Sequence, residues 1–140
     1  MFILDTNVVS ELRRPQKASR EVRAWASSIP FENFFLSAMT VFELERGTLR
    51  IGYRDKAQAK ILRAWIDEQI LPQFEGRIFA IDTAVAQRCA RLQVPNPRAE
   101  RDAFVAATAL VHGMTVVTRN VADFEATGAK LFNPWLPTQR

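Results

Sequence analysis

The chain has 140 residues, of which 48% are hydrophobic and 24% charged, and its formal net charge is +4. This size and composition predict one folded domain over residues 1–140 and argue against a disordered chain. No apolar stretch approaches the roughly 20 residues of a membrane-spanning helix. Asp5 stands where a signal peptide would carry basic residues, so we expect a cytoplasmic protein. The positive charge favours a polyanionic partner.

A single cysteine, Cys89, and a single histidine, His112, limit the chemistry that the chain can perform. They exclude an internal disulfide and a zinc site built on cysteine and histidine. A serine or cysteine nucleophile would have to rely on His112, which precedes Gly113 at an apparent helix end. We therefore expect any catalysis to depend on carboxylates, hydroxyls and basic groups.

In chain order, the first half of the sequence alternates short apolar runs with helical patterns. The elements predicted there are a strand at 2–4, a helix at 7–13 stopped by Pro15, a helix at 19–27 capped by Ser19, a strand at 34–36 and a helix at 40–50.

The second half continues the same alternation. The elements predicted there are a helix at 55–70 ended by Pro72, a strand at 78–81, a helix from Asp82 or Thr83 to 92, a loop at 94–97, a helix at 102–111, a strand at 115–118, a short helix at 120–125 and a weak strand at 131–132. Short, continuously apolar strands between helices indicate a parallel sheet covered on both faces. We predict a three-layer α/β/α domain with about four to five strands.

Four acidic residues fall where such a sheet would bring them together. Asp5 follows the first strand, and Glu43 lies in the helix after the second. Asp102 opens the helix that leads into the fourth strand, and Asp123 lies in the short helix after that strand. Ligands of open parallel sheets bind beyond the carboxyl ends of the strands, and all four positions lie at that edge.

Carboxylates gathered in one cleft repel each other, by about 4 kcal/mol per pair at ~4 Å and an effective dielectric near 20. Protons or a cation must neutralise such a cluster. Mg²⁺ and Mn²⁺ prefer oxygen ligands, and they activate water and stabilise charge on a phosphoryl group. A divalent-metal site is one interpretation of the four acids.

Each acid also has a structural interpretation. Asp5 suits a helix N-cap, Glu43 stands at capping-box spacing from Thr40, and Asp102 and Asp123 favour helix N-termini electrostatically. Asp82 fits an N-cap so well that we leave it out of the site. Glu45 is a rival to Glu43, but two residues along a helix turn it to another face.

Four ordered segments carry a resemblance to a known family. They are ILDTNVVSEL at 3–12, TVFEL at 40–44 followed by Gly47, RDAFVAATA at 101–109 and VTRNVADF at 117–124. Together they resemble the motifs of PIN-domain ribonuclease toxins of the VapC type, over nearly the whole chain. The ending FNPW at 132–135 is similar to the FitB-like subgroup.

The resemblance implies a Mg²⁺- or Mn²⁺-dependent endoribonuclease, the toxin of a type II toxin–antitoxin pair. It implies Asp5, Glu43, Asp102 and Asp123 as catalytic acids, the three aspartates as metal ligands, and hydrolysis to a 5′-phosphate and a 3′-hydroxyl. It also implies an RNA substrate, a cognate antitoxin, a homodimer, and contact with DNA only through the antitoxin.

Other polar residues beside the motifs have predicted supporting roles. Thr6 and Thr118 would orient a carboxylate or water, although simple turn or cap roles fit them equally well. Some relatives carry an acid where this chain has Asn120, so either Asn120 or Asp123 completes the site. We expect Arg119 to contact an RNA phosphate.

Two basic groups, 13–23 and 46–54, would hold RNA or form a solvated surface. The apolar residues of the helix at 57–71 would meet an antitoxin, a second subunit or the core.

Three rival functions remain open from the sequence. An aspartyl phosphatase uses an Asp after the first strand, but it normally needs a second acid two residues on, where this chain has Asn7. A nucleotide-binding protein is disfavoured because the five glycines form no phosphate-binding loop. The non-enzymatic alternative is a non-catalytic PIN-like protein that binds RNA or an antitoxin.

Overall fold

The computed structural model describes residues 1–137 and contains a parallel five-stranded sheet in the order β3-β2-β1-β4-β5. The strands are β1 (Phe2–Leu4), β2 (Phe34–Ser37), β3 (Ile78–Phe79), β4 (Thr115–Val117) and β5 (Lys130–Phe132). The central strand β1 pairs with β2 on one side and with β4 on the other. The predicted parallel sheet is confirmed, and the strand predicted at 78–81 pairs only over its first two residues.

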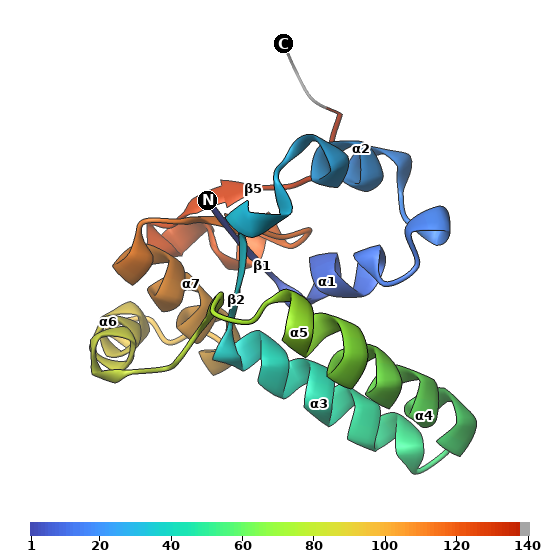
Figure 1. Ribbon diagram of the computed structural model, residues 1–140. Helices are drawn as coiled ribbons and strands as arrows, with labels where there is room; N and C mark the ends of the chain where they lie inside the picture. The colour runs from blue at the N-terminus through green and yellow to red at the C-terminus, as the bar shows by residue number, and fades with distance from the viewer. Residues whose placement is uncertain (138–140) are drawn as a thin grey trace.

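Helices cover both faces of this sheet, so the three-layer prediction is confirmed (Figure 1). The helices are α1 (Thr6–Leu12), α2 (Arg20–Ser28), α3 (Ala38–Gly52), α4 (Lys56–Trp65), α5 (Leu71–Gln73), α6 (Thr83–Gln93) and α7 (Glu100–His112). Single turns are η1 (Pro15–Lys17), η2 (Phe31–Asn33), η4 (Val121–Asp123) and η5 (Glu125–Thr127), and η3 (Ile66–Ile70) is a π-helical turn.

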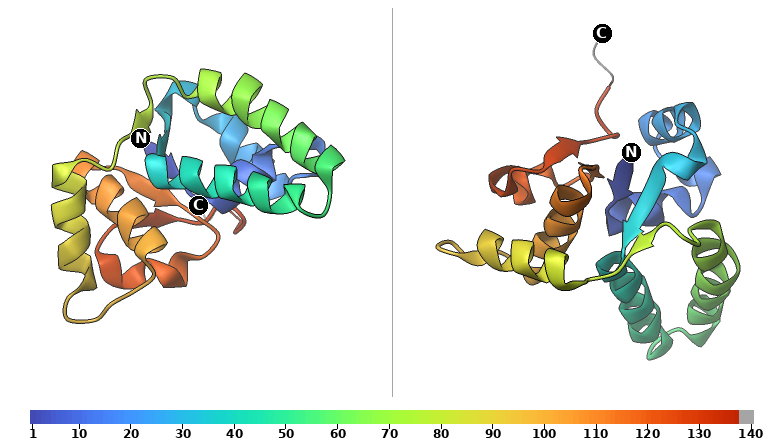
Figure 2. Two further views of the ribbon diagram at one scale, coloured as in Figure 1. Left: turned by 90° about the horizontal axis from the view of Figure 1, so that it is seen from below. Right: turned by 60° about the vertical axis from the view of Figure 1, so that its left-hand side comes forward.

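The strand side chains alternate between two hydrophobic cores. Ile3 and Val116 pack against α7 on one face, and α6 covers α7 from outside. Leu4, Leu36 and Val117 face α1, α2 and the α3–α4 hairpin on the other side. The two layers stand on opposite sides of the strands in Figure 2.

One helix prediction needs correction, because the chain does not leave the helix at Pro72. The π turn η3 follows α4, with the Leu71 N–H bonded to the Ile66 carbonyl, and the chain continues into α5. Pro72 is the second residue of α5, which directly follows the π turn. The short helix predicted at 120–125 is instead the two turns η4 and η5.

The predicted helix end at His112 is confirmed, since His112 lies in the last turn of α7 and its ring stacks on Phe79. The single cysteine, Cys89, is buried. No helix within residues 1–137 is long and apolar enough to cross a membrane.

Candidate active site at the carboxyl edge of the sheet

Asp5 lies at the centre of the carboxyl edge and is fully buried. Its backbone N–H donates to the Val117 carbonyl of the neighbouring strand (2.9 Å), which fixes its position relative to β4. Its carboxylate accepts hydrogen bonds from the Thr6 N–H (2.8 Å) and from the Thr118 hydroxyl (2.8 Å). Burial raises the pKa of Asp5, and the Thr118 and Thr6 hydrogen bonds oppose that rise. Asp5 therefore caps α1, as its structural interpretation predicted, and also faces the site.

Glu43 points from α3 towards the same edge. One of its carboxylate oxygens accepts from the Thr6 hydroxyl (2.6 Å), and the other accepts from Arg101 (2.9 Å). The capping-box interpretation is wrong, because Ser37 caps α3 and Thr40 lies within the helix. The rival Glu45 does face elsewhere, and it forms an ion pair with Arg63 of α4.

Asp102 enters from the first turn of α7 and is mostly buried. Burial raises the pKa of Asp102, the Arg101 charge opposes this, and Asp123, Asp5 and Glu43 add to the rise. Asp123 is exposed on η4, close enough to act electrostatically on Asp102. The structure therefore brings Asp5, Glu43 and Asp102 together, with Asp123 beside Asp102.

Arg101 joins these acids, although sequence analysis gave it no role. Its guanidinium lies 2.9 Å from Glu43, 2.9 Å from Asp102 and 3.9 Å from Asp5. Burial lowers the pKa of Arg101, but the charges of Glu43, Asp102 and Asp5 outweigh burial and raise it. A signal was present in the sequence, since a cation in the first turn of a helix opposes the helix dipole and needs another reason to be there.

Asn7 was also missed as a site residue. Its amide nitrogen lies 3.4 Å from both the Asp5 carboxylate and the Thr118 hydroxyl, and its amide oxygen accepts from the Arg119 N–H (3.3 Å). Asn7 therefore connects α1 to the segment after β4. Its place two residues after Asp5 was the available signal.

Among the predicted site residues that follow β4, Thr118 and Asn120 lie at the carboxyl edge of the sheet, whereas Arg119 is on the surface. Thr118 also accepts from the Asn120 N–H (3.0 Å), so Asn120 lies beside the site through its backbone. The exposed Arg119 stacks over the Trp135 ring, 5.2 Å from its centroid.

The acidic side chains at this edge could bind a hard divalent cation, because such ions prefer carboxylate oxygens as ligands. One buried oxygen, Oδ1 of Asp102, has no hydrogen-bond partner, since Arg101 approaches it out of line. As the side chains stand, no three acidic, cysteine or histidine side chains within residues 1–137 surround a common point. The guanidinium of Arg101 provides positive charge among them.

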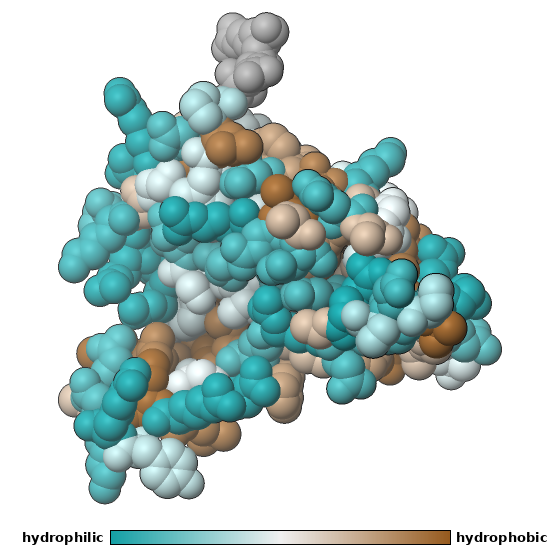
Figure 3. Space-filling model, turned by 180° about the vertical axis from the view of Figure 1, so that it is seen from behind, coloured by the Kyte–Doolittle hydropathy of each residue, from teal (hydrophilic) through white to brown (hydrophobic). Residues whose placement is uncertain are grey.

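A cleft of about 440 Å³ leads away from Thr6 and Glu43 between α1 and the α3–α4 hairpin. It is visible from behind as the hollow above the hairpin (Figure 3). Arg13 and Arg14 line it on the α1 side. The cleft thus joins the acidic edge to part of the predicted basic run.

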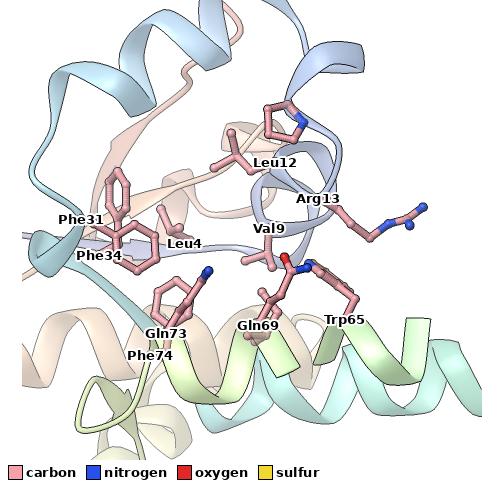
Figure 4. A pocket seen from close by; sticks show the side chains of 12 residues that line it. Leu4, Val9, Leu12, Arg13, Phe31, Phe34, Trp65, Gln69, Gln73 and Phe74 are labelled. Atoms are coloured by element: carbon pink, nitrogen blue, oxygen red, sulfur yellow. The ribbon is translucent and has the colours of Figure 1, made fainter. Parts of the chain in front are cut away.

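A second cavity, of about 270 Å³, is lined mainly by aromatic and aliphatic residues and shares Arg13 with the cleft. Figure 4 shows Phe31 and Phe34 at one end, Val9 and Leu12 of α1 above, and Trp65, Gln69 and Phe74 below. We name this cavity the aromatic groove. Its one charged side chain among the described residues is Arg13.

Comparison with known proteins identifies the family of the chain. Toxin FitB of Neisseria gonorrhoeae is 39% identical over 140 residues, covering 96% of this chain and 99% of FitB. VapC ribonuclease Y4jK of Sinorhizobium fredii is 34% identical over 142 residues, covering 98% and 99%. The structure of FitAB bound to an IR36 DNA fragment has a chain 37% identical to this one, with a TM-score of 0.87 and 99% of each chain covered. The PIN-domain family profile matches residues 2–130. The chain belongs to the PIN-domain family.

Proposed function

We propose that this chain is an endoribonuclease that requires Mg²⁺ or Mn²⁺ and is the toxin of a type II toxin–antitoxin pair in the cytoplasm. The observation that carries the proposal is the convergence of Asp5, Glu43 and Asp102 at one edge of the sheet. These acids come from three separate elements, and burial raises the pKa of two of them. Neighbouring acids with perturbed pKa values are candidates for a catalytic site. The relatives named as toxin and VapC ribonuclease support the same activity.

Asp5, Asp102 and Asp123 would hold the metal, with Glu43 beside them. When bound, such an ion supplies an activated water and stabilises negative charge on a phosphate. Thr118 and Thr6 keep the Asp5 carboxylate oriented and favour its ionised form. Water would attack the phosphodiester in line and leave a 5′-phosphate and a 3′-hydroxyl.

The RNA backbone would follow the cleft that begins at Thr6 and Glu43. Arg13 and Arg14 would contact phosphates there, and Arg119 would contact one on the other side of Asp5. The Arg119 guanidinium stacks over the Trp135 ring, and this contact restricts the positions that the guanidinium can take.

Cleavage of a mixed pool of structured and single-stranded RNA tests the activity. We expect cleavage with Mg²⁺ or Mn²⁺, none with EDTA, and a loss of at least about 100-fold in Asp5→Asn, as when one electrostatic group is removed from an active site. Asp82→Asn is the matched control, because Asp82 only caps α6. Metal-independent cleavage, or products with 2′,3′-cyclic phosphates, would contradict the proposal.

The antitoxin would place an apolar segment in the aromatic groove. Aromatic side chains line this groove, and an acidic group of the segment would pair with Arg13 at its mouth. The solved relative is named FitAB and is bound to DNA, whereas the curated relative is named FitB. A second component that binds DNA is consistent with both names.

Growth rescue tests this partner and the groove together. Cells expressing the chain should stop growing, and a genomic fragment that encodes the antitoxin should restore growth. Gln69→Arg puts a charge into the groove and should stay toxic but resist rescue. Gln87→Arg, on the exposed side of α6, should be rescued like the unchanged chain. Equal rescue of both variants would mean that the antitoxin binds elsewhere.

A further inference from the structure

Arg101 occupies the middle of the acidic site. Nη1 lies 2.9 Å from Oε2 of Glu43 and 3.9 Å from Oδ1 of Asp5, and Nη2 lies 2.9 Å from Oδ1 of Asp102. One guanidinium therefore faces three carboxylates that come from three different elements. Asp5 is fully buried and only 10% of the Glu43 and Asp102 side chains is exposed, so solvent screens these charges weakly.

The three contacts differ in quality. The Glu43 contact is a hydrogen bond of 2.9 Å, and the other oxygen of Glu43 accepts a hydrogen bond from the Thr6 hydroxyl. The Asp102 contact is short but out of line, so Oδ1 of Asp102 lacks a hydrogen-bond partner. The Asp5 contact is long. Arg101 is thus anchored on Glu43 and only loosely held by the two aspartates.

The same two aspartates are the proposed metal ligands. A divalent ion bound to these oxygens would lie close to the guanidinium, and two positive charges repel strongly at short range where solvent screens weakly. The guanidinium and a divalent ion therefore compete for Oδ1 of Asp5 and Oδ1 of Asp102.

We propose that Arg101 is the resident counter-ion of the acidic site. In the metal-free protein it neutralises Asp5, Glu43 and Asp102, and it releases both aspartates when a divalent ion binds while keeping its hydrogen bond to Glu43. This inference rests on the proposed function, because the competing ligand is the metal assigned there. Arg101 then sets the ion concentration at which the site fills.

Mn²⁺ binding to the metal-free protein tests the competition without any measurement of activity. Calorimetry or electron paramagnetic resonance would compare the unchanged protein, Arg101→Gln and the control Arg91→Gln. Arg91 is exposed on α6 and makes none of the contacts of Arg101, so its substitution removes the same unit of charge and leaves the ion pairs with the acids intact. We expect Arg101→Gln to lower the Mn²⁺ Kd by at least about tenfold, since no charged contact has to be broken first. Arg91→Gln should change it less than about twofold.

Equal Kd values in the two variants, or weaker binding by Arg101→Gln, would overturn the inference and leave the metal site itself intact. If neither the unchanged protein nor either variant binds Mn²⁺, both the inference and the proposed metal dependence are wrong. The outcomes therefore separate the two proposals.

Side-chain NMR on the unchanged protein avoids the question of whether Arg101→Gln folds. The Nε–Hε signal of Arg101 should move when diamagnetic Mg²⁺ is added, and the change should saturate with the bound fraction. The signals of the other arginines outside the site should stay in place. Mg²⁺ saturation with an unmoved Arg101 signal would also overturn the inference.

Discussion

Two opposed effects act on the pKa of a single residue, Asp5. Complete burial favours its protonated form, and the hydrogen bonds from Thr118 and Thr6 favour its ionised form. The Thr118 hydroxyl is itself buried and also accepts the Asn120 N–H. The charge state of Asp5 therefore depends on a hydroxyl that lies 113 residues away in the sequence.

Thr118→Val should raise the pKa of Asp5, because it deletes a hydrogen bond that favours the carboxylate. We expect the acidic limb of the pH–rate profile to move to higher pH, and cleavage near neutral pH to fall by about tenfold, as for a lost hydrogen bond to a charged group. The measurement is the pH dependence of RNA cleavage. Thr108→Val is the control, because this buried hydroxyl of α7 donates only to the Phe104 carbonyl. An unmoved profile would mean that Asp5 does not control the pH dependence.

Helix α3 carries two acidic residues that bind different partners. Glu43 turns to the sheet edge, and Glu45 pairs with Arg63 across the hairpin, with a distance of 2.7 Å between Nη2 and Oε2. Arg63 also bonds Asp67 one turn further along its own helix. The Glu45–Arg63 contact thus ties α3 to α4 and fixes one side of the cleft.

The hydrogen bond from Arg63 lowers the pKa of Glu45 below its usual value of 4.5. A lowered carboxyl pKa contributes stability that is present above the unfolded-state pKa and is lost as the pH falls through the folded-state pKa. Glu45→Gln should therefore lower the free energy of unfolding by about 1 kcal/mol at pH 7, a value discounted for partial exposure, and by nothing measurable near pH 2. Urea denaturation over this pH range would measure the difference.

Glu68→Gln is the control for this prediction, since Glu68 is exposed on η3 and forms no ion pair among the described residues. A difference between Glu45→Gln and the unchanged protein that is constant with pH would show that Glu45 acts through packing rather than charge.

At the scale of the whole molecule, α3 keeps one apolar stripe outside the core. Phe42, Leu49 and Tyr53 recur at spacings of seven and four residues, which places them on one side of the helix, and all three are exposed. Leu49 and Tyr53 also line a shallow pocket at the hairpin tip. This stripe is our candidate for the homodimer interface that the family resemblance implies.

Leu49→Asp should convert a dimer into a monomer, because it places a charge in an apolar contact. Light scattering after size-exclusion chromatography would give the mass. Ile61→Asp, at another exposed apolar position on α4, should leave the dimer unchanged. A monomeric unchanged protein, or a dimeric Leu49→Asp, would remove this surface as the interface.

Local signals in the sequence predict most of the elements and the positions of the acids along them. Apolar runs, Pro15 and Gly113 mark the strands and helix ends, because these signals act within a few neighbouring residues. Because ligands of open parallel sheets bind beyond the carboxyl ends of the strands, the order of these elements also predicts that Asp5, Glu43 and Asp102 lie close together. Predictions that failed were also local: Ser37 rather than Thr40 caps α3, and η3 carries the helix past Pro72.

Which side chains contact one another inside the site depends on how the layers pack in three dimensions. The Arg101–Glu43 hydrogen bond joins residues 58 positions apart, and no periodicity in the sequence encodes that distance. The aromatic groove likewise combines η2, β2, α1 and η3, whose side chains look like ordinary core residues when read along the chain. Side-chain direction in space depends on packing between layers, so the resident cation and the open groove emerge only when the layers are assembled.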